Sequence, residues 1–133
     1  MEGGGAAGGA GAGISAFLKA RMVKGIDVMI KHTGLEEKIK GADYIFTGEG
    51  SVDEQTAFGK TLSGVIRLAK QHNKPVIAFA GNVADPDMLY QQGITAIFGI
   101  MPSVLTLKEA LKAGKENLER TVCSVVKLID YKK

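Results

Sequence analysis

Three short apolar runs alternate with longer segments in which apolar residues recur every three or four positions. The runs cover residues 44–46, 75–81 and 94–100, and none of them contains a charged residue. Short runs of β-branched and aromatic residues predict buried strands, and the longer spacing predicts helices between them. This alternation predicts an α/β fold with a mostly parallel sheet, in a Rossmann-like or flavodoxin-like three-layer αβα arrangement.

The predicted helices carry residues that are typical of helix ends. Apolar residues from Leu62 to Ala69 form a helical stripe, and the helix is expected to end by Asn73. Three further pairs of residues are typical of helix starts, and a long final helix is expected after the last pair. These signals are Thr33 with Glu36, Asp85 with Pro86 before a helix closed by Gly93, and Thr106 with Glu109.

Residues 3–13 consist only of glycine and alanine. This segment could be a flexible linker. It could also be a phosphate loop, because residues 3–8 match G-x-G-x-x-G, but that motif should follow a strand and only two residues precede it. We favour the third interpretation, a helix whose small face admits another backbone and which ends near Gly25.

The size of the chain indicates one α/β domain over residues 1–133. Three clear strands are few for a doubly wound sheet, in which about five or six are usual. The chain also begins inside a glycine-alanine segment. We therefore expect an incomplete domain that forms the later part of a larger fold.

Composition limits the possible partners and the compartment. The net charge is +3, and lysines are interleaved with acids, so we expect no nucleic-acid partner. An apolar run of about 18 residues would indicate a membrane span, and the sequence has none. The single cysteine, Cys123, suits a reducing compartment, and we expect a cytoplasmic protein.

A polar stretch, residues 47–60, follows the first predicted strand. The carboxyl ends of parallel strands share one edge of a sheet, where ligands of α/β proteins bind. We therefore expect a ligand-binding loop here. Gly59-Lys60-Thr61 ends like a phosphate-binding P-loop, but Glu54 stands where that motif requires glycine, so a P-loop is excluded.

The residue types of this stretch suit phosphoryl transfer. Glu49 and Asp53 can bind Mg²⁺, or one of them can accept a proton from a hydroxyl. The stretch also offers backbone N–H groups, neutral hydrogen bonds and a positive charge for an anion. These come from Gly48 and Gly50, from Gln55 and Thr56, and from Lys60.

Three other interpretations of the same residues stay open. Ser51 and Glu54 have capping-box spacing, so the acids could belong to a helix start. The chain could be a non-catalytic nucleotide-binding or anion-binding module, which would tolerate neutralised acids. It could also be an inactive fragment that acts through protein association.

Residues 41–56, followed by Gly59-Lys60, resemble the signature of the type 1 glycerate kinases. The similarity continues through residues 64–65, 75–78, 81 and 116–121. This resemblance implies phosphorylation of D-glycerate by ATP with Mg²⁺. It implies catalytic or metal-binding roles for Asp53 and Glu49, and it places the other polar residues in the substrate and phosphate site: Gly48, Gly50, Ser51, Gln55, Thr56 and Lys60.

The sequence departs from that family pattern at several places. Ser51 stands where a basic residue is frequent, and Leu62 stands where proline is frequent. Nothing matches the aspartate-containing segment near the family's N-terminus, so the chain resembles the C-terminal portion alone. We expect weak or absent turnover by this chain, with the N-terminal portion or a second copy in a homodimer as possible partners.

Overall fold

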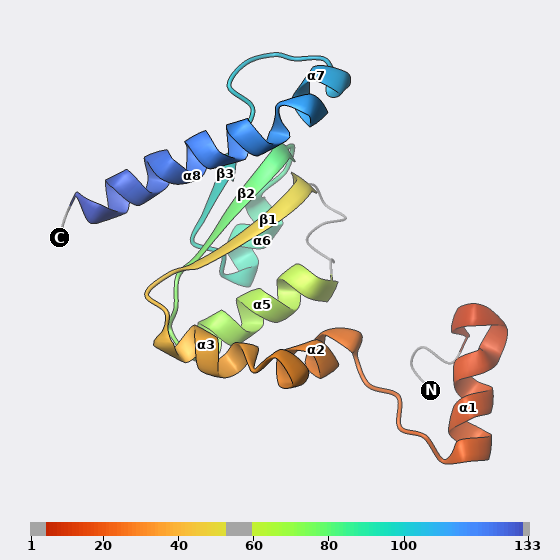
Figure 1. Cartoon of the computed structure of the whole chain (residues 1–133). Coiled ribbons are helices and arrows are strands. Elements are labelled where there is room, and N and C mark those ends of the chain that lie inside the picture. Colours follow the sequence, from red (N-terminus) through yellow and green to blue (C-terminus); the bar gives the residue numbers. More distant parts are fainter. Residues whose placement is uncertain (1–4, 53–59, 132–133) are drawn as a thin grey trace. The chain divides into compact units, whose positions relative to one another are not determined.

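The computed structural model describes residues 5–52 and 60–131, without the side chains of Ala6 and Lys60 (Figure 1). The chain forms two compact units, Met1–Gly34 and Leu35–Lys133. We call them the N-terminal unit and the sheet unit and describe each by itself. No helix within 5–52 or 60–131 is long and apolar enough to cross a membrane.

The N-terminal unit contains a 3₁₀ helix, η1 (Ala6–Gly9), and two α-helices, α1 (Ala10–Leu18) and α2 (Gly25–Thr33). The helix predicted in the glycine-alanine segment exists, but it ends at Leu18 because Lys19 adopts a left-handed conformation with φ of 50°. The expected close approach of another backbone is not found at four glycines of this segment. A Cβ atom added to Gly5, Gly8, Gly9 or Gly13 would meet nothing within 4 Å.

The junction between the two units corrects one capping prediction. Thr33 does not cap the following helix; its hydroxyl donates to the carbonyl oxygen of Met29 at 2.7 Å, inside α2. Gly34, with φ of 61°, ends α2 in the left-handed conformation. The predicted helix nevertheless follows as α3 (Leu35–Gly41). The hydroxyl of a threonine at a helix end can bond to either neighbouring helix, and that of Thr33 bonds to the preceding helix, α2.

The sheet of the sheet unit has the order β1-β2-β3 among the described residues, and both pairs are parallel. The strands are β1 (Ile45–Val52), β2 (Val76–Val83) and β3 (Ala96–Gly99). Ile45 lies opposite Val76, and Val52 lies opposite Val83. β1 therefore continues well beyond the predicted run, which ended at Phe46.

This extension of β1 corrects the position of the predicted loop. Residues 47–52 were expected to leave the sheet, but they pair with residues 78–83 of β2. Because β2 is itself long, pairing with it satisfies those backbone groups of residues 47–52 that point towards β2. Gly48, Glu49, Gly50 and Ser51 are thus strand residues rather than loop residues.

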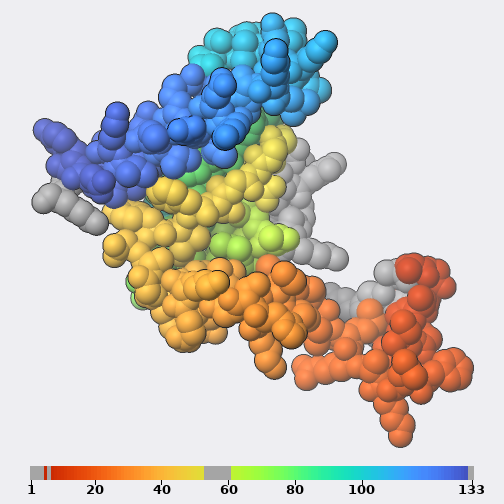
Figure 2. Space-filling view, in the orientation of Figure 1, coloured from red at the N-terminus to blue at the C-terminus, as the bar shows by residue number. Residues whose placement is uncertain are grey.

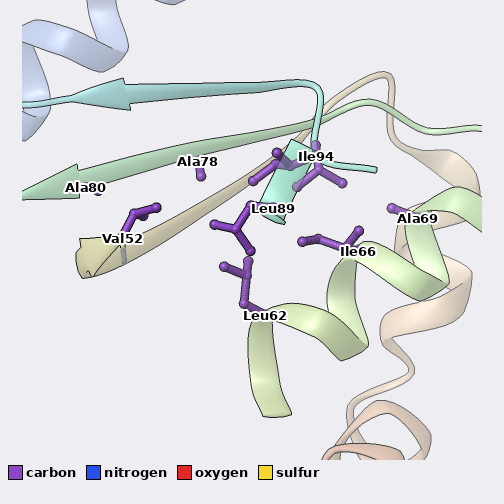
Figure 3. Packing of buried hydrophobic residues seen from close by; sticks show 9 residues of the cluster. Val52, Leu62, Ile66, Ala69, Ala78, Ala80, Leu89 and Ile94 are labelled. Atoms are coloured by element: carbon purple, nitrogen blue, oxygen red, sulfur yellow. The ribbon is translucent and has the colours of Figure 1, made fainter. Parts of the chain in front are cut away.

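One face of the sheet packs against α5 (Lys60–Gln71) and α6 (Asp87–Gln92). Figure 3 shows the side chains of Leu62, Ile66 and Leu89 meeting beneath the strands. Leu62, where the family pattern has proline, is 1% exposed and fills this core. The full buried cluster comprises Val52, Leu62, Ile66, Ala69, Val76, Ala78, Ala80, Leu89 and Ile94.

The other face of the sheet packs against α8 (Gly114–Asp130), which follows α7 (Leu107–Lys112). Val125 of α8 is buried with Ile77 and Phe79 of β2. The sequence predicted one long final helix, but the helix is interrupted at Ala113, with φ of −91° and ψ of 4°, so that α7 and α8 are separate. Helices cover both faces of a parallel sheet (Figure 1), so the predicted three-layer α/β fold is confirmed.

Candidate functional site

Four of the residues predicted to bind ligand lie in the second half of β1, at the carboxyl edge of the sheet. Gly48, Glu49, Gly50 and Ser51 are consecutive strand residues. The end of β2 lies beside them, because Ser51 is opposite Asn82 in the register. Neighbouring strand ends therefore bring side chains from distant parts of the sequence to one place.

Glu49 is partly buried and lies opposite Ala80. Exposure alternates along β1 from Ile45 to Ser51, and Ile45 packs against the core formed with α5 and α6. This alternation places Glu49 on the same strand face as Ile45. Its carboxylate thus belongs to the side of the sheet that faces α5.

The side-chain alternation of β2 is interrupted near Gly81, which lies beside Gly50 of β1. Ala80 and Val83 pack against the same core cluster although they are three residues apart. A Cβ atom added to Gly81 would lie 2.7 Å from the carbonyl oxygen of Gly50. The side-chain direction of Gly81 therefore points across to β1, and only glycine fits at this position.

Ser51 and Asn82 join the ends of β1 and β2. The side-chain amide of Asn82 donates to the hydroxyl of Ser51, with 3.3 Å between nitrogen and oxygen. Asn82 is exposed and Ser51 is partly buried. This contact places an amide and a hydroxyl together at the edge where a ligand is expected.

Asp85 has a structural explanation at the start of α6. Its Oδ1 accepts a hydrogen bond from the backbone N–H of Asp87 at 3.1 Å. The N-cap residue itself is Pro86, so Asp85 acts one position earlier than the sequence suggested. Gly93 ends α6 with φ of 110°, as predicted.

Part of the predicted site lies outside the described residues. Asp53, Gln55 and Thr56 fall within residues 53–59, and of Lys60 only the backbone, at the start of α5, is described. Their roles stay predictions. The suggested helix start at Ser51 is not found there, because Ser51 is a strand residue.

The magnesium site also stays a prediction. Within residues 5–52 and 60–131, no three His, Cys, Asp or Glu side chains gather closely enough to bind a metal ion. Mg²⁺ is commonly bound by one or two carboxylates together with substrate phosphates, so a cage of three protein ligands is not required. In the predicted site, Glu49 would supply one carboxylate and Asp53 would supply the second.

A helix residue that the sequence left without a role shares this region of the fold. Asn117 on α8 is 5% exposed and is the buried polar residue of the described core. A spacing signal could have identified it, since residues 117, 121, 125 and 129 stand four positions apart on one face of α8.

A parallel sheet with helices on both faces defines an α/β protein, and proteins of this class commonly bind ligands at the carboxyl edge of the sheet. Comparison with known families identifies the group within this class. The glycerate kinase family matches residues 1–130, and the chain therefore belongs to the glycerate kinase family.

Individual relatives agree with this assignment. The chain is 39% identical over its whole length to a glycerate kinase of Halalkalibacterium halodurans, and 44% identical over 94% of its length to one of Bacillus cereus. It is 41% identical over 90% of its length to a glycerate 2-kinase of Escherichia coli. It covers 35%, 33% and 32% of these proteins, so it spans about a third of the curated relatives it matches.

A solved structure gives the same result for the fold. It is described as a glycerate kinase 2 from Salmonella typhimurium LT2 and superposes with a TM-score of 0.75 at 39% identity. The match covers 97% of this chain and 33% of the other. The sheet unit and its helices are thus similar to part of a larger protein.

Proposed function

We propose that this chain is the C-terminal portion of a cytoplasmic glycerate kinase, which transfers the γ-phosphoryl group of ATP to a hydroxyl of D-glycerate. The observation that carries the proposal is the family match over residues 1–130. Relatives named glycerate kinase and glycerate 2-kinase support the same substrate class. The products are ADP and a phosphoglycerate.

The proposed chemistry assigns a role to each acid of the segment that follows Phe46. The glycerate hydroxyl oxygen bonds to the γ-phosphorus while the bond from that phosphorus to the ADP oxygen breaks. Asp53 or Glu49 would accept the hydroxyl proton, and the other carboxylate would help to hold Mg²⁺, which would neutralise charge on the phosphates. The partial burial of Glu49 at the carboxyl edge supports this role.

The remaining polar residues would bind substrate and phosphate. Lys60 contributes a positive charge, and the side chains of Ser51, Gln55 and Thr56 contribute hydrogen bonds. β1 is an edge strand among the described residues, so N–H groups of Gly48 and Gly50 can meet an anion on its open side. The contact between Asn82 and Ser51 supports a polar site at this position.

Binding without efficient turnover is the expected behaviour of the isolated chain. It spans about a third of its relatives, so residues that complete the site are expected from the N-terminal portion or from a second copy in a homodimer. Robust glycerate-dependent ADP formation by the 133-residue chain would contradict this expectation. A coupled assay for ADP, with and without D-glycerate, measures it directly.

Isothermal titration of the chain with Mg-ATP and with D-glycerate tests the proposal. We expect wild type to bind, and we expect Asp53→Asn or Glu49→Gln to weaken Mg-ATP binding at least about tenfold, because each removes a charge-assisted contact. Asp130→Asn, at the far end of α8, is the matched control and should bind as wild type. Binding that persists unchanged in both acid variants would instead favour a non-catalytic nucleotide-binding module.

A further inference from the structure

The inner face of α8 changes from apolar to polar along its length. Val125 is buried, and Ile129 packs against the same cluster on β2. One and two turns towards the N-terminus, the same face carries Thr121 and then Asn117. Asn117 is 5% exposed, so an amide occupies a position where the helix would otherwise bury an apolar side chain.

The polar end of this face lies at the carboxyl edge of the sheet. α8 runs antiparallel to the strands, and its first turns lie beside the arrowheads of β1 and β2 (Figure 1). The space-filling view shows the same turns of α8, in blue, next to the end of β1, in yellow (Figure 2). Asn117, near the start of α8, therefore lies towards the carboxyl edge of the sheet, on the face opposite to that of Glu49.

Asn117 holds an arginine at this edge. Its Oδ1 accepts a hydrogen bond from Nη2 of Arg120 at 3.2 Å. Its backbone carbonyl oxygen accepts a second bond from the hydroxyl of Thr121 at 2.9 Å. A buried amide is costly without partners, and the oxygen of this one accepts a hydrogen bond from Arg120, a residue that is exposed to solvent.

A guanidinium has five N–H donors in one plane and can bind a second acceptor while Asn117 accepts from one nitrogen. Carboxylates and phosphates match that plane with two parallel hydrogen bonds. Holding the side chain in one position reduces the rotamer entropy lost when such a ligand binds.

We propose that Asn117 and Arg120 form an anion-binding pair at the carboxyl edge of the sheet. Arg120 donates to an anionic oxygen of the ligand, and Asn117 is a positioning residue that acts through Arg120. The anion is the carboxylate of D-glycerate or a phosphate of ATP. This identification of the ligand rests on the proposed function, whereas the binding of an anion by the pair does not.

Titration of the 133-residue chain with D-glycerate, Mg-ATP and inorganic tripolyphosphate tests the pair. Arg120→Gln should weaken the binding of at least one of these three ligands about tenfold or more. Arg120→Lys should lose less affinity because it keeps the positive charge. Lys127→Gln removes the same charge further along α8 and should change affinity less than about twofold. The ligand that loses affinity identifies the source of the anion.

Two results would overturn the pair: wild-type affinity for all three ligands in Arg120→Gln, or no binding of any of them by the folded wild-type chain. Binding of tripolyphosphate alone that depends on Arg120 would support the pair and contradict the glycerate kinase proposal. Affinities that depend on Asp53 but not on Arg120 would support the glycerate kinase proposal and contradict the pair. The two proposals can therefore fail separately.

Asn117→Leu separates positioning from a merely structural role. It should weaken anion binding roughly two- to tenfold in the wild-type background, which corresponds to one neutral hydrogen bond. In an Arg120→Gln background it should have no further effect, because the amide acts only through the arginine. Equal losses in both backgrounds, with circular dichroism showing a folded chain, would contradict the positioning role.

Discussion

A Cβ atom added to Gly81 would lie only 2.7 Å from the carbonyl oxygen of Gly50. These residues belong to neighbouring strands, and the sites of Glu49 and Ser51 lie on either side of Gly50. The spacing of β1 and β2 at the carboxyl edge therefore requires glycine, which has no side chain, at position 81. Any side chain at position 81 must push the two strands apart.

Gly81→Ala is predicted to destabilise the sheet unit by about 1–3 kcal/mol, the usual cost of overfilling a packed position. The contact is with backbone, so it cannot be relieved by rotating a side chain. Urea unfolding monitored by circular dichroism measures the change in the free energy of unfolding. Because β1 moves as well, binding of Mg-ATP should weaken in the same variant.

Gly50→Ala is the matched control for this prediction. A Cβ atom on Gly50 would meet nothing within 4 Å, although its carbonyl oxygen is the atom that Gly81 approaches. Its free energy of unfolding should therefore stay close to that of wild type. Equal destabilisation by both substitutions would show that the close approach at Gly81 is not the cause.

Leu89→Ala is predicted to destabilise the sheet unit by about 2–5 kcal/mol. Leu89 is 0% exposed and lies against Leu62 beneath the sheet (Figure 3), so truncation leaves a cavity between α5 and α6. Leu128→Ala removes the same atoms from a side chain of α8 that is 68% exposed and should have a much smaller effect. Urea midpoints of the two variants give the comparison, and similar midpoints would contradict the assignment of the core.

Hydrophobic patterning was sufficient to predict the order of strands and helices in the sheet unit. The run at 94–100 contains β3, and the run at 75–81 covers most of β2, which continues to Val83. β1 was predicted too short because its second half, residues 47–52, has no apolar run. Those residues form a strand through pairing with β2, a tertiary effect that local sequence does not contain.

The candidate site was predictable by residue type more than by conformation. The parallel topology placed Glu49 and Ser51 at the carboxyl edge, as expected, although they lie in a strand rather than in a loop. Asn117 was included in the similarity over residues 116–121 but was given no role, because an asparagine in a helix does not by itself indicate burial. Only the packing of α8 shows that this amide faces the sheet.

The capping box at the start of α7 was predicted from Thr106 and Glu109 and is present in full. The hydroxyl of Thr106 donates to Oε2 of Glu109 at 2.6 Å, and the backbone N–H of Thr106 donates to the same oxygen at 2.9 Å. The hydrogen bond from the hydroxyl, followed by that from the backbone, lowers the pKa of Glu109 below its ordinary value of 4.5. Both bonds favour the ionised carboxylate.

This lowered pKa predicts a pH-dependent contribution to stability. A carboxyl group whose pKa is lower in the folded chain than in the unfolded chain stabilises the folded state. This contribution is fully present at pH values above the unfolded pKa and is lost as the pH falls through the folded pKa. Glu109→Gln should therefore reduce the loss of thermal stability between about pH 6 and about pH 3, because its side chain does not ionise. Glu116→Gln, in the first turn of α8, is the control. If both variants lose stability with acid as steeply as wild type, the capping carboxylate does not contribute to the pH dependence.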